Sequence, residues 1–187
     1  MITTNDLRSG TCFKYDDQLW RITEFAHVKP GKGPAFVRVK QVNLRTGAIV
    51  ERTYRAGEKV ENVRVEDRDM QYLYFDGTNY NFMDNETYEQ YSINEKLVGD
   101  KAGFFMENGN STVTVYNNEV LDVRPPNFIV VKVVRTDPGV KGDTAQGGSK
   151  PAQIESGATI MVPLFVGEGE VIKVDTRDGR YVERVKG

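Results

Sequence analysis

Short runs of apolar and aromatic residues, separated by pairs of turn-forming residues, recur along the whole 187-residue chain. The strand-like runs are rich in Val, Ile, Phe and Tyr, which favour extended backbone. Asn, Asp and Gly are the residues that tight hairpin loops prefer. The pattern therefore predicts a succession of antiparallel hairpins. The turn pairs are Asp16–Asp17, Thr46–Gly47, Asp76–Gly77, Asn117–Asn118 and Asp178–Gly179.

One short helix is expected in this otherwise extended chain. Ser92 and Glu95 have the spacing of a capping box, and Gly99 follows as a stop signal. Ile93 and Leu97 would share one face of that helix. A helix of this length would close the end of a barrel, so the predicted fold class is all-β.

Three small barrels in series account for the strand pattern better than one deep core, because only 39% of the residues are apolar. Residues 1–64 predict an SH3-like barrel of four or five strands. Residues 65–127 and 128–187 predict two OB-like barrels, with Pro125–Pro126 at their junction. The similar pentapeptides EVLDV (119–123) and EVIKV (170–174) suggest that these two barrels are copies with equivalent late strands.

Charge is divided unevenly among the three segments. Residues 1–64 carry 12 Lys and Arg against 7 Asp and Glu, a net charge of +5. Residues 65–128 carry 4 against 12, a net charge of −8, and residues 129–187 carry 9 against 8. The basic first segment is suited to a polyanion and the acidic second is not. Chance clustering of charge on solvated faces is the alternative.

The sequence contains none of the catalytic or metal-binding motifs that we considered. Cys12 and His27 are each the only residue of their type, which excludes an internal disulfide and a Cys/His zinc cluster. A single His in a β protein is more often a packed or surface residue than a catalytic one, so a Ser-His-Asp triad that uses His27 is not expected. Gly148 stands where a P-loop needs lysine. We expect no catalytic residue, no metal and no cofactor.

The chain shows no membrane or export signal. Its longest nearly apolar run, IMVPLFV (160–166), is interrupted by Pro163 and is far shorter than the roughly 18 residues of a membrane span. The N-terminus lacks a basic start followed by an apolar stretch. A cytoplasmic protein without membrane partners is expected.

The stretch HVKPGKGPAFVRVK (27–40) predicts a hairpin tip that projects Lys32 between Gly31 and Gly33. A solvated turn lysine is the simplest interpretation. A Schiff-base nucleophile would need burial to lower its pKa, which this tip cannot provide. The third interpretation is a cation inserted into a cavity of another molecule. Nearby cations at Lys29, Arg38 and Lys40 would then hold phosphates around it.

A second glycine-rich stretch, GDTAQGG (142–148), lies in the last third of the chain. Consecutive glycines allow backbone N–H groups to converge on an anion, so phosphate binding is one interpretation. A surface loop without a ligand is the other.

Several blocks of this sequence resemble the bacterial translation elongation factor P family, in the same order along nearly the whole chain. VKPGKGPAFVRVK resembles the tip of its first domain, and YLYFDGTNYNFMDNETYEQ resembles its second. PPNFIVVKVVRTDPGVKGDTAQGGSKPA and GATIMVPLFVGEGEVIKVDTR resemble its third. The third-domain signature falls on Lys150, Pro151, Ala152, Gly157, Val162 and Pro163.

The resemblance implies an SH3-like, or KOW-like, domain followed by two OB-fold domains. It also implies a factor that binds the ribosome between the P and E sites, beside the peptidyl-tRNA, and relieves stalling at consecutive prolines. By the same resemblance, Lys32 reaches toward the CCA end of that tRNA, and Gly142, Asp143 and Thr144 face the small subunit and the E-site codon. The residues expected to contact tRNA or ribosomal RNA are Lys29, Gly31, Lys32, Gly33, Arg38, Lys40, Tyr181 and Arg184.

Family members often carry a post-translational extension on the tip residue, which makes Lys32 a modification candidate and a lysine-modifying enzyme a candidate partner. The ribosome and the P-site peptidyl-tRNA are the other expected partners, and a monomer is expected. A general single-stranded RNA-binding protein built from OB-like barrels is the alternative function. The acidic second segment argues against that alternative.

Overall fold

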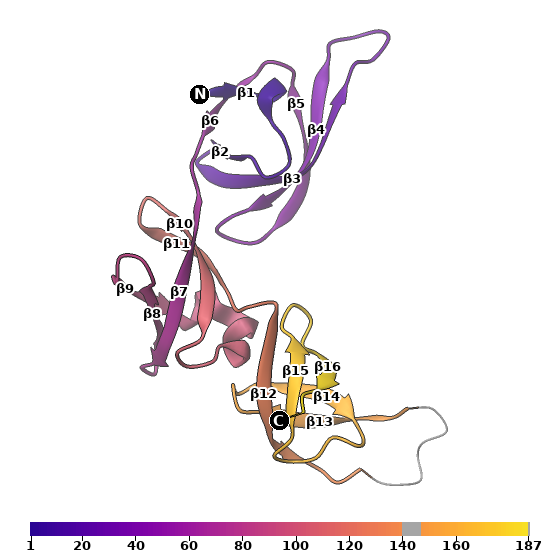
Figure 1. The fold of residues 1–187 in the computed structure, drawn as a ribbon. Coiled ribbons are helices and arrows are strands. Elements are labelled where there is room, and N and C mark those ends of the chain that lie inside the picture. Colours follow the sequence, from indigo (N-terminus) through magenta and orange to yellow (C-terminus); the bar gives the residue numbers. More distant parts are fainter. Residues whose placement is uncertain (140–146, 187) are drawn as a thin grey trace. The chain divides into compact units, whose positions relative to one another are not determined.

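The computed structural model describes residues 1–139 and 147–186 of the chain. These residues form three antiparallel sheets with short helical turns between strands (Figure 1), as the all-β prediction required. The chain divides into two compact units. One contains Met1–Asp67 with Thr114–Asp122, and the other contains Arg68–Val113 with Val123–Gly187.

The first sheet has six strands, one more than the sequence led us to expect, in the order β1-β6-β2-β3-β4-β5. Asp16 and Asp17 both have positive φ (50° and 58°), which suits the predicted two-residue turn. The turn joins Tyr15 to Gln18, which pair directly. The strands are β1 (Ile2–Thr3), β2 (Cys12–Tyr15), β3 (Gln18–Val28), β4 (Phe36–Asn43), β5 (Ile49–Arg55) and β6 (Lys59–Asn62), with a 3₁₀ turn at Thr4–Asp6.

The core of this first sheet is aromatic as well as aliphatic. The Tyr54 side chain is 2% exposed and donates its hydroxyl to the buried Gln41 side-chain oxygen, 2.9 Å away. Rings of Phe13 and Tyr15 meet Tyr54 edge-on, with centroids 5.9 and 5.1 Å away. Burial of these side chains anchors the root of the β3–β4 hairpin. The buried members are Leu7, Phe13, Trp20, Ile22, Val37, Val39, Tyr54 and Val60.

The second sheet has five strands in the order β11-β10-β7-β8-β9. Its predicted first hairpin is present, but the two loop residues are Gly77 and Thr78 rather than Asp76 and Gly77. Phe75 pairs with Tyr80, and the Asp76 N–H donates to the Asn79 carbonyl. The strands are β7 (Glu66–Phe75), β8 (Asn79–Asp84), β9 (Gln90–Asn94), β10 (Asn110–Tyr116) and β11 (Glu119–Arg124).

The turn is displaced by one residue because the Asp76 carboxylate accepts hydrogen bonds from the backbone N–H groups of Thr78 and Asn79, at 2.9 and 2.8 Å. Gly77 takes the positive φ of 101° that the first loop position needs. In contrast, Asn117 and Asn118 occupy their predicted turn, with φ of 47° and 63°.

The short helix also exists, as α1 (Glu95–Val98), followed by a 3₁₀ turn at Gly99–Phe104. Its N-cap is Asn94, whose side-chain oxygen accepts from the Lys96 N–H at 3.0 Å. The predicted cap, Ser92, lies in β9 instead. The Ser92 hydroxyl donates to the Asn81 side-chain oxygen at 2.7 Å. This cross-strand hydrogen bond uses the hydroxyl that a capping box would need.

The third sheet has five strands in the order β14-β13-β12-β15-β16, the same connectivity as the second sheet. The two-copy prediction is therefore supported by topology. The pentapeptide argument for it is wrong: EVLDV forms the fifth strand of its sheet, whereas EVIKV overlaps the fourth. The strands are β12 (Phe128–Thr136), β13 (Ser149–Ile154), β14 (Thr159–Pro163), β15 (Val171–Asp175) and β16 (Arg180–Arg184).

Candidate nucleic-acid interface

The β3–β4 hairpin of the first sheet presents Lys32 at its end. The two strands remain paired as far as Val28 and Phe36, so the tip consists of the seven residues 29–35. Alternate β4 side chains, Val37 and Val39, are at most 1% exposed and fix the hairpin to the core. The extended projection of Lys32 thus begins at a buried root.

The tip itself is slender and exposed. Lys29, Pro30, Gly31, Lys32 and Gly33 are all exposed. Within residues 1–139 and 147–186, no hydrogen bond or ion pair holds the Lys32 ammonium. The bare glycines on either side leave this cation accessible from most directions.

Gly33 accounts for the shape of the tip. Its φ is +116°, a value that other residues rarely adopt, whereas Gly31 has an ordinary φ and open space around its Cα. Glycine is therefore required at position 33 by conformation. Position 31 requires only that the side chain be small or mobile.

The outer face of the hairpin carries the other predicted cations. Arg38 is exposed and lies between Ala26 of β3 and Thr53 of β5. Lys40 lies between Glu24 and Glu51, and its ammonium is 3.2 Å from the Glu24 carboxylate. Alternation along β4 brings both side chains to one face, but the ion pair partly neutralises Lys40.

Sequence reasoning missed one cation on this face. Arg55 is exposed and pairs across the sheet with Phe36, the first β4 residue after the tip. Arg55 is distant in sequence from the tip, so only the β4–β5 register reveals that it lies beside Phe36, at the base of the tip. His27 is exposed on β3 opposite Val37.

The two C-terminal predicted residues, Tyr181 and Arg184, lie on β16 of the third sheet. A side chain that the sequence did not single out, Phe165, joins them. The Tyr181 ring meets the Phe165 ring edge-on at 6.4 Å, and the Arg184 guanidinium lies 4.7 Å from the centre of the same ring. Arg184 also pairs with Glu170 at 3.1 Å.

The hairpin residues and the β16 residues belong to different compact units, and each set is described by itself. The predicted small-subunit loop at Gly142, Asp143 and Thr144 lies outside the described residues. Among the described residues, no cluster of three or more His, Cys, Asp and Glu side chains could hold a metal ion. No described helix is both long and apolar enough to span a membrane.

Three family models match the chain in succession. They are the elongation factor P KOW-like domain over residues 3–60, the elongation factor P OB domain over residues 65–123, and the C-terminal domain of elongation factor P over residues 129–184. The KOW-like and OB barrels, with the exposed basic tip, define a translation factor rather than an enzyme.

Comparison with related proteins identifies the family within this class. The elongation factor P of Moorella thermoacetica is 53% identical over 184 residues, which are 98% of this chain and 100% of that protein. The elongation factor P of Synechocystis is 52% identical, covering 98% of both chains. The chain belongs to the elongation factor P family, and it is a translation elongation factor.

Solved structures of lower identity share the fold. The translation initiation factor 5A from Methanococcus jannaschii matches with a TM-score of 0.51 and 22% identity, over 65% of this chain and 94% of that one. A translation initiation factor 5A family protein from Naegleria fowleri matches with a TM-score of 0.52 and 16% identity, over 66% of this chain and 96% of its own.

Proposed function

We propose that this elongation factor binds the ribosome between the P and E sites and promotes peptide bond formation at consecutive prolines. The observation that carries the proposal is the exposed Lys32 ammonium, held at the end of a paired hairpin whose root is buried. Such a tip suits a narrow RNA-lined cavity, where a bulkier loop would clash. The family membership supplies the translation context.

The proposed mechanism is positioning. Proline is a poor nucleophile and its ring restricts the nascent chain, so the reacting groups sit misaligned. Correct orientation of two reactants corresponds to effective molarities of about 10⁵ M or more, so alignment alone accounts for a large part of such a barrier. Lys32 steadies the CCA end of the peptidyl-tRNA, and the ribosome forms the bond. The chain itself carries out no chemistry.

Electrostatics supports the hairpin as the RNA-facing element. An ammonium or guanidinium placed beside phosphate releases condensed counterions, which strengthens association at low salt. The residues directly opposite Arg38 on the neighbouring strands, Ala26 and Thr53, are not acidic, and Lys29 lies within the tip. We assign the main phosphate contacts to Lys29, Lys32 and Arg38, with a smaller contribution from Lys40 because Glu24 pairs with it.

The remaining parts of the proposal concern the other barrels and the partners. Tyr181 and Arg184 contact the tRNA, and the loop at Gly142–Thr144 faces the small subunit. The functional domains are residues 1–64, 65–127 and 128–187 of a cytoplasmic monomer. A lysine-modifying enzyme that extends Lys32 is a further proposed partner.

Replacement of Lys32 by alanine tests the proposal. Lys32→Ala should leave the melting temperature unchanged, because the side chain is exposed. It should abolish relief of polyproline stalling in a reconstituted translation assay. Lys59→Ala, which removes another exposed lysine of the first sheet, is the matched control and should retain activity. Full activity of Lys32→Ala would reject the positioning role.

The alternative of a general single-stranded RNA-binding protein predicts a different result. Such a protein retains long unstructured RNA on a filter at micromolar concentration, whereas the proposed ribosome factor does not. Filter binding with a long homopolymer, measured beside binding to intact ribosomes, separates the two functions.

A further inference from the structure

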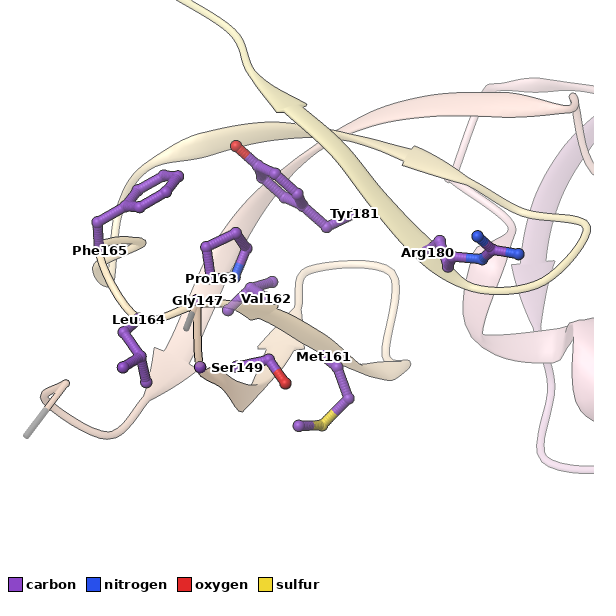
Figure 2. Close-up of a pocket in the computed structure, with 10 residues that line it drawn as sticks. Gly147, Ser149, Met161, Val162, Pro163, Leu164, Phe165, Arg180 and Tyr181 are labelled. Atoms are coloured by element: carbon purple, nitrogen blue, oxygen red, sulfur yellow. The ribbon is translucent and has the colours of Figure 1, made fainter. Parts of the chain in front are cut away.

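A pocket of about 670 Å³ opens on the third sheet, beside Tyr181. Its wall begins at the start of β13, follows β14 and the residues after it, and closes at β16 (Figure 2). Figure 2 shows Phe165 and Tyr181 on one side of the pocket, with Pro163 facing them and Met161 farther along β14. The pocket lies within a single compact unit.

The lining is apolar and open to solvent. Phe165 is 60% exposed and Met161 is 54% exposed, although both would ordinarily favour burial. Pro163 and Leu164 continue the same surface between them. Single exposed apolar residues are common, but a contiguous set around a hollow indicates a binding site.

Phe165 is held in a defined orientation. The Arg184 guanidinium lies over its ring at 4.7 Å, and Tyr181 meets its edge. Glu170 fixes the guanidinium through a 3.1 Å ion pair and accepts a 2.8 Å hydrogen bond from the Gly167 N–H. An oriented ring loses little entropy when a planar ligand stacks on it.

The charges at the pocket favour an anionic ligand. Arg180 lines one end, where its guanidinium pairs with the Asp178 carboxylate at 2.7 Å, and no carboxylate belongs to the described lining residues themselves. Arg184, beside Phe165, retains N–H donors that the single Glu170 contact does not use. An apolar, aromatic hollow bordered by guanidinium groups matches a nucleotide, whose flat base is flanked by phosphates.

The position of the pocket in the barrel agrees with this chemistry. The third sheet runs β12 to β16, so β13 and β14 are its second and third strands. The face formed by the second and third strands is where OB-fold barrels in general bind oligonucleotides.

We propose that this pocket binds one unstacked RNA base, which stacks on Phe165 and meets the nearly perpendicular Tyr181 ring at its edge, while Met161 and Pro163 form the floor. Arg180 and Arg184 contact the flanking phosphates. The proposal rests on the proposed ribosome function and goes beyond it, because it adds recognition of a base by Phe165 and Met161 to contact with the tRNA by Tyr181 and Arg184.

The methionine methyl groups provide a direct test in the full chain. With ¹³C-methyl-methionine labelling, the short RNA rArArA should shift the Met161 methyl resonance upfield, through the ring current of a stacked base. The expected dissociation constant is about 1 mM, because only one stacked base and its flanking phosphates contact the pocket. The buried Met70 methyl is an internal control that should not move. Ribose 5-phosphate, which lacks a base, should leave Met161 unchanged.

Variants distinguish stacking from other causes. Phe165→Ala should weaken the rArArA response of Met161 at least fivefold, and Phe165→Trp should preserve it. Val134→Ala, at a similarly exposed residue of the same sheet, should have no effect. An unchanged response in Phe165→Ala, or an equal response to ribose 5-phosphate, would overturn the proposal. So would a stronger Met161 shift with the tripeptide Gly-Phe-Gly, which would identify a protein side chain as the occupant.

The outcome is independent of the hairpin. The Lys32→Ala variant should bind rArArA as the wild-type chain does. Failure of the positioning role would therefore leave binding of the base by the pocket unaffected. Conversely, a lost Met161 response with intact relief of stalling would reject only the base pocket.

Discussion

The Lys40 ammonium lies 3.2 Å from the Glu24 carboxylate across the β3–β4 ladder, whereas Arg38, two residues nearer the tip, lies between Ala26 and Thr53. The two cations share one face of the hairpin but differ in their availability to phosphate. An exposed ion pair contributes little to stability, yet it reduces the net charge that RNA encounters. This difference leads to the first prediction.

Arg38→Ala should weaken ribosome binding more than Lys40→Ala. Loss of one phosphate contact reduces the slope of log K against log salt by about 1, so the Arg38 variant should show that change and the Lys40 variant a smaller one. Ribosome co-sedimentation over a range of potassium concentrations measures both slopes. Glu24→Gln is the complementary variant, because it frees Lys40 and should strengthen binding at low salt. Equal effects at Arg38 and Lys40 would contradict the assignment.

Gly33 and Gly31 form a matched pair for the shape of the tip. Gly33→Ala forces a side chain into a φ of +116°, which costs about 1–3 kcal/mol if the conformation is kept. Relief of polyproline stalling should therefore fall by about tenfold, which corresponds to ~1.4 kcal/mol. Gly31→Ala, at an ordinary φ with no atom within 4 Å of the added Cβ, should remain close to full activity.

Thermal unfolding provides the control for this pair. Both glycines lie in the exposed tip, so neither change should lower the melting temperature by more than a few degrees. A large loss of stability in Gly33→Ala would mean that the tip contributes to folding rather than to placement of Lys32.

Ribosome association as a whole should weaken steeply with salt. The first 64 residues have a net charge of +5, and at least three cations of the hairpin are assigned to phosphate contacts. With Z contacts the slope of log K against log salt is about −0.7Z to −0.9Z, so three contacts give a slope of about −2 or steeper. Filtration or sedimentation at several salt concentrations determines the slope. A flat response would exclude an RNA-facing hairpin.

Asp175 should make acid unfolding depend on its ion pair. Hydrogen bonds from the Arg177 side chain, at 2.6 and 2.9 Å, lower the pKa of Asp175 from 3.8 to about 2. The stabilisation is complete above about pH 4 and is lost as the pH falls toward the folded-state pKa, because protonation ends the pairing. The stability difference between the unmodified chain and Asp175→Asn should therefore shrink between about pH 4 and pH 2.

Urea unfolding at half-unit pH steps measures this difference. Arg177→Ala removes the same hydrogen bonds from the other side and should show the same dependence on pH. A stability difference that stays constant from pH 5 to pH 2 would contradict the assignment to this pair.

Hairpin positions followed closely from the sequence, because turn chemistry is local. Asn117–Asn118 and Asp16–Asp17 adopt the positive φ that such pairs favour. Predictions made from residues adjacent in sequence were wrong where a polar side chain had a second possible hydrogen-bond partner. Ser92 bonds to Asn81 across the sheet instead of capping the helix, and the Asp76 carboxylate shifts its turn by one residue.

The candidate functional residues show the same difference between local and long-range effects. Lys32 and its glycines were evident from spacing alone, since a tip is made by neighbours in the chain. Arg55 and Phe165 were not, because their relation to the hairpin and to Tyr181 comes from strand register and ring packing between residues distant in sequence.

The amino-acid sequence by itself determined the all-β class, the family and the exposed lysine of the tip, because hydrophobic alternation, turn residues and ordered motifs act over short distances along the chain. Only the tertiary structure decided which cations are free and which are paired, and where an aromatic pocket opens. Those properties arise when strands from different parts of the chain are placed in register, so that the neighbours of each charge and ring are set by the fold.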